Sequence, residues 1–316
     1  MRLTTIIATS IAFVEAISIP STGTTSLREE ATKSNLLLGS GAINPFYLNA
    51  SQFRAVLSKQ FNSLTPENEL KWNFVHPAKS QYDWRNLDRL VKFADANNME
   101  VKGHALRAEI TNHFVVIIHR YHGKIDRWDV VSEALKTNGS GLAPNHFYGT
   151  LGPSWVEDAF RIARAADPDA KLFLNENLVE VQPKKRQELY DMVSELVHKG
   201  VPIDGIALQM HITREPLVPG VIQEMVESYR ALGLQVTIAE MDVHTYNVNQ
   251  QAEIYGDTVK EALDAGITDI SFWGFTDKHL YTWLPGAKPL MFNETYHPKS
   301  AFYSTHYVLT DFNERS

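Results

Sequence analysis

The sequence contains no cysteine among its 316 residues. Disulfide bonds and thiolate metal ligands are therefore excluded, and the folded chain must depend on its hydrophobic core. Positive charge is also scarce, because 30 Lys and Arg face 37 Asp and Glu and leave a formal net charge of −7. This balance argues against a nucleic-acid partner and against binding to an anionic membrane surface.

The apolar run near the N-terminus, residues 6–14, is too short to span a membrane. It follows Arg2 and leads into two candidate cleavage sites, after Val14-Glu15-Ala16 or after Ala16-Ile17-Ser18, a pattern typical of a secretory signal peptide. We therefore expect residues 1–18 to be a signal peptide and the mature protein to be secreted and extracellular. A frayed cytosolic N-terminus is the alternative. Three N-glycosylation sequons favour secretion in a eukaryote, at Asn49, Asn138 and Asn293.

Hydrophobic residues make up 44% of the chain, which is enough for a sizeable core. The length fits one large barrel or two ordinary domains. Residues 19–35 are rich in Ser, Thr and charge, so we expect an N-terminal linker there. Regular structure is expected to begin at Leu36. Because no shift in composition divides residues 36–316, we predict a single domain over that range.

The second half of the chain alternates short apolar runs with amphipathic stretches. Gly200, Gly233 and Gly266 each follow an amphipathic stretch, where glycine permits the left-handed residue that ends a helix. They are 33 residues apart (233 − 200 and 266 − 233), which is the length of one strand-helix unit. The clearest helix face has i, i+3, i+4, i+7 spacing and consists of Leu189, Met192, Val193 and Leu196.

Eight strands are predicted, near residues 36–41, 58–64, 100–105, 126–131, 171–175, 204–209, 235–240 and 268–274. Helices are predicted between them, near residues 50–58, 85–97, 113–121, 153–166, 184–199, 218–232, 248–265 and 298–308. Eight alternating units in this length point to an α/β fold, the (β/α)8 TIM barrel. The alternative is a doubly wound sheet, which usually has a glycine-rich phosphate turn after its first strand. The segment Gly39-Ser40-Gly41 lacks the remaining glycine of that turn.

Two of the predicted strands end in a glutamate. An apolar strand at 236–239 is followed by Glu240, and another at 128–132 is followed by Glu133. In a barrel of this kind, the carboxyl ends of the strands carry the chemistry. Two carboxylates at these ends are the layout of a glycosidase, which needs one acid/base and one nucleophile or base.

Polar and aromatic residues collect at the same strand ends, where amides can bind hydroxyls and indole rings can stack on sugars. These motifs resemble glycoside hydrolase family 10, the endo-β-1,4-xylanases, from about residue 36 to residue 308. In chain order the motifs are Asn62 to Trp72, Gly103-His104, Trp128 to Ala134, Asn175, Gln209-Met210-His211, Glu240-Met241-Asp242, Trp273-Gly274 with Asp277-Lys278, and Phe292 to Lys299.

The resemblance implies a retaining mechanism with Glu133 as general acid/base and Glu240 as nucleophile. His211 would hydrogen-bond Glu240, and Asp242 would orient His211. The resemblance also implies sugar-binding roles for Glu67, Asn68, Lys71 and His104 on the non-reducing side of the cut, for Gln209 near the reacting ring, and for Trp273 and Trp283 as platform and lid. No metal-ligand spacing stands out, and we expect no cofactor.

The sequence departs from the family pattern in three places. Ser132 stands where family members usually have an Asn whose amide reaches the sugar 2-hydroxyl, and its shorter side chain weakens that contact. Ala108 and Glu109 replace the usual Trp and His of the segment after His104. Finally, only 29 residues separate His104 from Glu133 (133 − 104), which predicts a truncated third βα unit. A genuine deletion and an incorrectly joined gene model both account for the short spacing.

The leading prediction is a secreted, monomeric endo-1,4-β-xylanase that acts on xylan or xylo-oligosaccharides. The alternative is a catalytically impaired relative that binds xylan or a plant xylanase inhibitor protein as a decoy. The altered residues Ser132, Ala108 and Glu109 favour the decoy, whereas survival of both catalytic carboxylates favours the enzyme. A third hypothesis is a barrel glycosidase acting on a β-glucan, which the xylanase-like sugar-binding motifs make weaker.

Overall fold

The computed structural model describes residues 24–78, 81–104 and 110–316. The strands are β1 (Leu37–Ile43), β2 (Ser63–Pro66), β3 (Glu100–Gly103), β4 (Arg127–Ser132), β5 (Lys171–Glu176), β6 (Gly205–Leu208), β7 (His211–Thr213), β8 (Gln235–His244) and β9 (Asp269–Phe272). The helices are α1 (Leu27–Lys33), α2 (Ser51–Gln60), α3 (Trp72–Val75), α4 (Arg85–Ala96), α5 (Ile110–Tyr121), α6 (His146–Leu151), α7 (Trp155–Ala166), α8 (Pro183–His198), α9 (Val221–Ala231), α10 (Val248–Asp264) and α11 (Ser300–Arg315), with 3-10 helices η1 (Pro45–Asn49) and η2 (Gly152–Ser154). The expected signal peptide, Ala108 and Glu109 lie outside the described residues.

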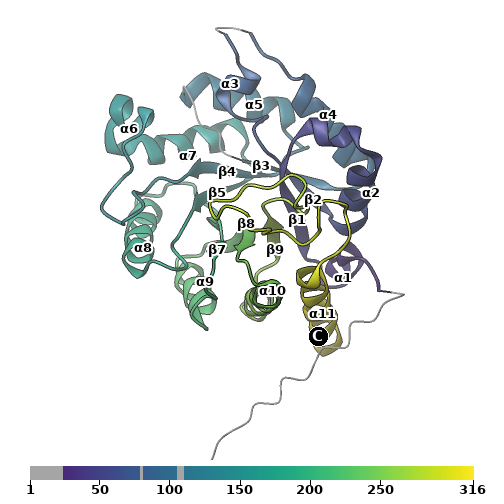
Figure 1. Cartoon of the computed structure of the whole chain (residues 1–316). Helices are drawn as coiled ribbons and strands as arrows, with labels where there is room; N and C mark the ends of the chain where they lie inside the picture. Colours follow the sequence, from purple (N-terminus) through teal and green to yellow (C-terminus); the bar gives the residue numbers. More distant parts are fainter. Residues whose placement is uncertain (1–23, 79–80, 105–109) are drawn as a thin grey trace, which may run out of the picture.

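Eight parallel strands close into a barrel with the helices around it (Figure 1). The strand order is β6-β5-β4-β3-β2-β1-β9-β8, and a further pairing between β6 and β8 closes the ring. The short strand β7 lies outside the ring and pairs with the carboxyl end of β8. The predicted (β/α)8 barrel is therefore confirmed, because a doubly wound sheet would leave two open edges.

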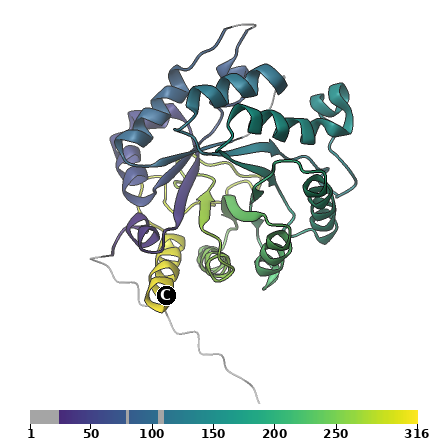
Figure 2. The same ribbon diagram turned by 180° about the vertical axis from the view of Figure 1, so that it is seen from behind.

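The two ends of the barrel differ. At the carboxyl ends of the strands, the long yellow segment between β9 and α11 crosses in front of the barrel in Figure 1. Figure 2 shows the opposite end, where the chain leaves the helices and enters the strands. The first end carries most of the predicted site residues, because they lie in the later part of a strand or in the segment that follows one.

The helices cover the barrel with the apolar faces that the sequence predicts. In α8, Leu189, Val193 and Leu196 are buried, and Met192 packs partly buried beside them. The predicted glycine stops are also confirmed, because Gly200, Gly233 and Gly266 follow α8, α9 and α10 with φ of 66°, 79° and 83°. These left-handed values favour glycine over every other residue.

Regular structure begins earlier than predicted, so the expectation of a linker up to residue 35 is wrong for its last part. Residues 27–33 form α1 because Ser26 and Glu29 make a capping box at its start. Leu27 and Ala31 are fully buried, and Gln60 of α2 accepts a hydrogen bond from the Leu27 amide at 2.9 Å. The helix is thus part of the domain.

The second strand was predicted at 58–64, but helix α2 continues to Gln60 and β2 begins only at Ser63. Phe53 and Leu57 are buried on one face of α2, and their burial stabilises the helix beyond its predicted end. Asn62 follows and bonds the backbone of β1 through its side chain, donating to Leu36 O at 2.9 Å and accepting from Leu38 N at 2.7 Å.

The third helix was predicted to begin at residue 113, but α5 begins at Ile110 and has 12 residues. This equals the length of α4 and α7. Helix α5 is therefore as long as these two helices, and residues 104–109 separate β3 from α5.

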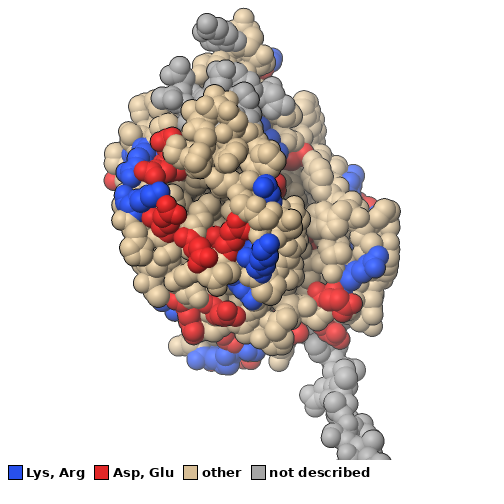
Figure 3. Space-filling view, turned by 90° about the vertical axis from the view of Figure 1, so that its left-hand side faces the viewer, with Lys and Arg blue, Asp and Glu red and all other residues tan. Residues whose placement is uncertain are grey.

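On the side of the molecule seen in Figure 3, where α6, α7 and α8 lie, acidic and basic side chains are interspersed. Arg161 contacts Glu157 at 3.0 Å on α7, and Lys199 contacts Glu195 at 2.6 Å at the end of α8. Within the part of the chain that the structure describes, no helix has the length and apolarity that crossing a membrane requires.

Candidate active site

Glu240 lies inside β8 and not at its end, so the prediction that the strand stops there is wrong. The strand continues to His244 because residues 242–244 pair with β7. Glu240 is only 4% exposed. Its carboxylate is thus carried by a backbone that is paired on both sides, by β7 and β9.

Glu133 directly follows β4, as predicted, and its backbone adopts an unusual conformation. Its φ is 55°, in the left-handed region that costs a glutamate of order 1–3 kcal/mol. The Glu133 amide donates to Asn175 O at 3.0 Å, which extends the pairing between β4 and β5 by one residue. The strained residue is therefore fixed at the end of its strand, with its side chain half-buried.

A chain of two amide side chains connects the two glutamates. Gln209 Nε2 lies 3.2 Å from Glu133 Oε1 and donates to Asn175 Oδ1 at 2.8 Å. Asn175 Nδ2 in turn donates to Glu240 Oε1 at 2.9 Å. The hydroxyl of Ser132 also donates to Asn175 Oδ1, at 3.3 Å. The structure therefore brings both predicted carboxylates, Gln209 and Ser132 into one network.

His211 and Asp242 stand beside Glu240 as predicted. His211 Nδ1 lies 2.8 Å from Asp242 Oδ1, and His211 Nε2 lies 3.5 Å from Glu240 Oε2. Burial alone would lower the pKa of His211, but the two carboxylates outweigh it and raise that pKa well above its ordinary value. The imidazolium and the buried Asp242 thus form a charged pair behind Glu240.

Glu240 keeps a low pKa despite its burial. Burial raises the pKa of a carboxyl, but the nearby His104 and His211 have the opposite effect, and the net result is a pKa below the ordinary value. His104 Nδ1 lies 3.6 Å from Glu240 Oε1, and His211 approaches the other oxygen. Glu240 is therefore ionised near neutral pH.

His104 is positioned by a buried ion pair that the sequence did not single out. His104 Nδ1 lies 3.1 Å from Asp129 Oδ2, and Lys102 Nζ lies 3.2 Å from Asp129 Oδ1. Burial opposes ionisation of Asp129, but Lys102 and His104 outweigh it and lower its pKa. Asn175 also donates to Asp129 at 3.2 Å, which joins this group to the network of the glutamates.

The close packing of β3 on β4 requires a glycine before His104. A Cβ at Gly103 would lie 2.0 Å from the indole ring of Trp128. Trp128 is fully buried and its Nε1 donates to Ile125 O at 3.1 Å. The Gly103-His104 motif therefore combines a packing residue with a site residue.

A second group follows β2 and contains three predicted sugar-binding residues. Lys71 Nζ donates to Asn68 Oδ1 at 2.8 Å, and Asn68 Nδ2 donates to Glu67 Oε1 at 2.8 Å. The hydroxyl of Tyr281, from the segment after β9, also donates to Glu67. The group offers an ammonium, an amide and a carboxylate at the barrel's carboxyl end, which suits hydroxyl groups.

The two predicted tryptophans contact the two histidines that lie beside Glu240. The Trp273 ring meets His104 edge-on, with ring centroids 5.2 Å apart. Trp283 lies in the segment after β9, is 52% exposed, and packs on His211 and His244 at 5.0 Å and 3.9 Å. Its Nε1 donates to Thr213 Oγ1 at 2.7 Å. Each histidine beside the buried carboxylate thus has an aromatic ring against it.

The sequence pattern described as Glycosyl hydrolase family 10 matches residues 26–107 and 105–307. The chain belongs to this family. The two matched segments meet at residues 105–107, in the connection where the sequence predicts missing family residues.

Named relatives agree over nearly the whole chain. Endo-1,4-beta-xylanase B of Thermotoga neapolitana is 34% identical over 313 residues, covering 88% of this chain and 90% of its own. Native xylanase 10B from Thermotoga maritima has a TM-score of 0.86 and 36% identity, covering 92% of this chain and 100% of its own. Xylanase 10B from Thermotoga petrophila, solved in complex with xylobiose, has a TM-score of 0.84 and 36% identity, covering 92% and 99%.

Four residues in this family 10 site were assigned no role from the sequence. Asp129 lies inside a motif and Asn175 is a motif of its own, and their position on strands that lead to the site was the signal that could have suggested a role. His244 is fully buried with its Nε2 2.8 Å from Asp242 Oδ1, and its two-residue spacing from Asp242 places both on one face of β8. Tyr281 lies in a loop, where no periodicity could predict its contact with Glu67.

Two groups of potential metal ligands lie in the site. Among the described residues, His211, Asp242 and His244 form one group, and His104, Asp129 and Glu240 form another. In both groups the histidines and carboxylates contact one another at 2.8–3.6 Å. These contacts account for the close spacing, since the ring nitrogens face carboxylate oxygens.

Proposed function

We propose that the chain is an endo-1,4-β-xylanase that cleaves its substrate with retention, using Glu133 as acid/base and Glu240 as nucleophile. The observation that carries this proposal is the hydrogen-bonded chain from Glu133 through Gln209 and Asn175 to Glu240. It fixes two carboxyl groups relative to each other at the carboxyl end of the barrel. Retaining glycosidases need two such groups on either side of the scissile bond.

In the proposed reaction, the Glu240 carboxylate attacks the anomeric carbon while Glu133 gives a proton to the departing glycosidic oxygen. A covalent glycosyl-enzyme forms. Glu133, now a carboxylate, then removes a proton from water, which attacks the anomeric carbon and releases Glu240. The protonated His211 supports the first step because it keeps Glu240 ionised when no substrate is bound.

The substrate assignment rests on the relatives and on the site. The similar proteins include xylanases of three Thermotoga species, and the one from Thermotoga petrophila was solved with xylobiose. The polar group at Glu67, Asn68 and Lys71 and the ring of Trp273 offer hydrogen bonds and an aromatic surface to such a sugar. We therefore propose β-1,4-xylan and xylo-oligosaccharides as substrates.

The test compares reducing-sugar release from xylan by the wild type and by Glu240→Gln. The wild type should hydrolyse xylan and the variant should not, with both proteins equally folded by circular dichroism. Proton NMR of the first products should show the β-anomer before mutarotation. Initial α-anomer would contradict retention, and turnover by the variant would contradict the role of Glu240. A parallel assay on β-glucan separates a xylanase from a glucanase.

One observation supports the decoy hypothesis. The Ser132 hydroxyl donates to Asn175, so it points into the protein network. A folded wild type that binds xylan, or a plant xylanase inhibitor protein, without hydrolysing xylan would support the decoy and overturn the enzyme.

We also propose that the protein is secreted. Support comes from the expected signal peptide and from two sequons, at Asn49 and Asn138, whose asparagines are exposed. Expression of the full chain in a eukaryotic host should place glycosylated protein in the medium. Unglycosylated protein retained in the cells would contradict this proposal.

A further inference from the structure

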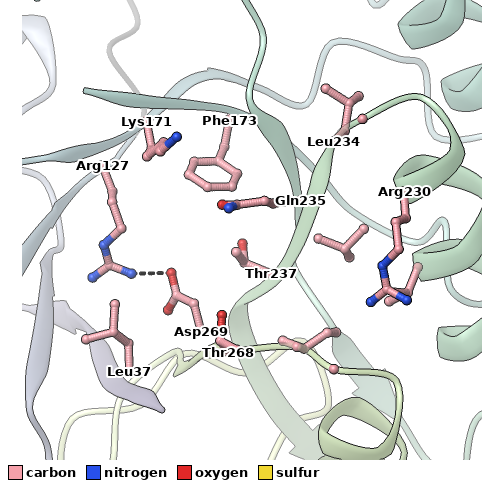
Figure 4. Close-up of a pocket in the computed structure, with 15 residues that line it drawn as sticks. Leu37, Arg127, Lys171, Phe173, Arg230, Leu234, Gln235, Thr237, Thr268 and Asp269 are labelled. Carbon is pink, nitrogen blue, oxygen red and sulfur yellow. Dashed lines mark hydrogen bonds and ion pairs between the residues drawn. The ribbon is translucent and has the colours of Figure 1, made fainter. Parts of the chain in front are cut away.

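A second cavity, of about 420 Å³, opens at the amino ends of the strands, opposite the candidate active site. Its wall includes the first residues of five strands, namely Leu37, Arg127, Lys171, Gln235 and Asp269. Figure 4 shows these side chains, with Thr237 and Phe173 near the centre and Arg230 on the far side. Since the proposed xylanase chemistry lies at the other end of the barrel, it makes no use of this cavity.

Three polar atoms of buried residues in the cavity wall lack hydrogen-bond partners among the described residues. They are Thr237 Oγ1, Arg127 Nε and Asp269 Oδ1. Each of these residues is less than 9% exposed. Buried polar atoms are nearly always hydrogen-bonded, so three at one cavity indicate a place for a polar guest.

The charges of the cavity favour an anion. Arg127 forms an ion pair with Asp269, donates to Ser63 Oγ at 3.1 Å, and lies 3.5 Å from Glu100. Lys171 and Arg230 add two cations for which the described part of the chain shows no ion pair, although Arg230 donates to Ala265 O at 3.0 Å. In a chain of net charge −7, this is a local excess of positive charge.

The remaining lining favours a guest that also carries hydroxyls. The free oxygen of Asp269 accepts a hydroxyl proton but repels a bare anion, and the Thr237 hydroxyl offers a second partner. The ring of Phe173 and the side chains of Leu234 and Val236 add an apolar surface. Carboxylate, hydroxyls and a compact carbon skeleton are combined in a sugar acid.

We propose that this cavity binds a small hydroxylated carboxylate of the sugar-acid class. Its carboxylate lies toward Lys171 and the outer edge of Arg127, which are on the same side of the cavity in Figure 4. Its hydroxyls bond Thr237 and Asp269. Binding at this end is independent of the active-site groove, because the two sites are at opposite ends of the barrel strands.

The test is isothermal titration of the whole protein with D-glucuronate, D-xylose and inorganic phosphate. Glucuronate should bind, whereas xylose lacks the carboxylate and phosphate lacks the hydroxylated ring, so both should bind more weakly. Lys171→Met and the isosteric Thr237→Val should each weaken glucuronate binding by roughly tenfold, as loss of one charge-assisted or buried hydrogen bond implies. Lys124→Met is the matched control, because Lys124 is exposed near the same end of the barrel but does not line the cavity.

Each other outcome overturns the proposal. Absence of heat with all three probes would mean that the cavity holds solvent only. Phosphate binding as tight as glucuronate would indicate a plain anion site. Glucuronate binding that survives Lys171→Met and Thr237→Val but is lost in Trp273→Ala would belong to the active-site groove. Hydrolysis of xylan by Lys171→Met should equal that of the wild type, so failure of this proposal is distinguishable from failure of the xylanase assignment.

Discussion

Ser132 is one of the residues at which the sequence is expected to depart from the usual family pattern. Its hydroxyl is committed to Asn175 at 3.3 Å, so it contributes no amide to the sugar. We expect Ser132→Asn to raise kcat/KM on xylan by about tenfold, since bonds to the 2-hydroxyl strengthen in the transition state. Steady-state kinetics beside Ser132→Ala, which should show no gain, would check this. Equal rates in all three proteins would mean that another feature limits turnover.

His211 is one of the two histidines that lower the pKa of Glu240, beside His104. Because the imidazolium lowers the pKa of Glu240, its removal should raise that pKa. We therefore expect His211→Asn to lower kcat and to move the acidic limb of the kcat/KM profile to higher pH. The matched control is His198→Asn, on the exposed outer side of α8, which should leave the profile unchanged. An unshifted limb in His211→Asn would show that His104 alone sets the charge of Glu240.

At the scale of elements, helix α1 belongs to the domain, although the polar composition of residues 19–35 predicts a linker there. Leu27 of α1 is fully buried, and α1 packs against α2, α11 and β1. We expect Leu27→Ala to lower the free energy of unfolding by roughly 2–4 kcal/mol, because it leaves a cavity in the core. Leu151→Ala, at a position that is 43% exposed, should cost less than 1 kcal/mol. Urea denaturation measures both, and equal costs would mean that α1 is only loosely attached.

Element prediction succeeded where apolar periodicity and glycine stops coincide, as in α8, α9 and α10. It failed at α1, where a capping box was present at Ser26 and Glu29 but the surrounding composition is polar. It also failed at the end of β8, because the extra pairing with β7 depends on residues thirty positions away in the chain. Such long-range pairing leaves no local signal in the sequence.

The candidate site was predictable to the extent that its residues lie late in strands. Glu133, Glu240, His211 and Asp242 are in mutual contact or linked through shared partners, as expected. The amide bridge through Asn175 and the second histidine, His244, depend on how neighbouring strands are staggered. That stagger is set by the register of the closed barrel, which a single sequence does not contain.

At the scale of the whole molecule, one buried acid links stability to pH. Glu180 is 2% exposed, and neither of its carboxyl oxygens has a hydrogen-bond partner among the described residues. Burial raises its pKa from 4.5 to about 7. The folded state therefore binds one proton more than the unfolded state between these values, so stability falls as pH rises through this window.

We expect Glu180→Gln to gain about 3 kcal/mol of stability relative to the wild type as pH rises from 4 to 8. Urea denaturation at several pH values measures the difference. Glu195→Gln is the control, because Glu195 is exposed on α8. A difference that stays constant with pH would show that Glu180 is ionised in the folded protein throughout.

The pairing of β7 with β8 has a mechanical consequence. Asp242 N donates to Met210 O at 3.4 Å and Trp273 N donates to Met241 O at 3.1 Å, so the backbone beside Glu240 is tied to both neighbouring strands. The carboxylate cannot travel with a loop toward its target. In the proposed reaction, the sugar ring therefore has to move toward a carboxylate whose backbone is held in place by two neighbouring strands.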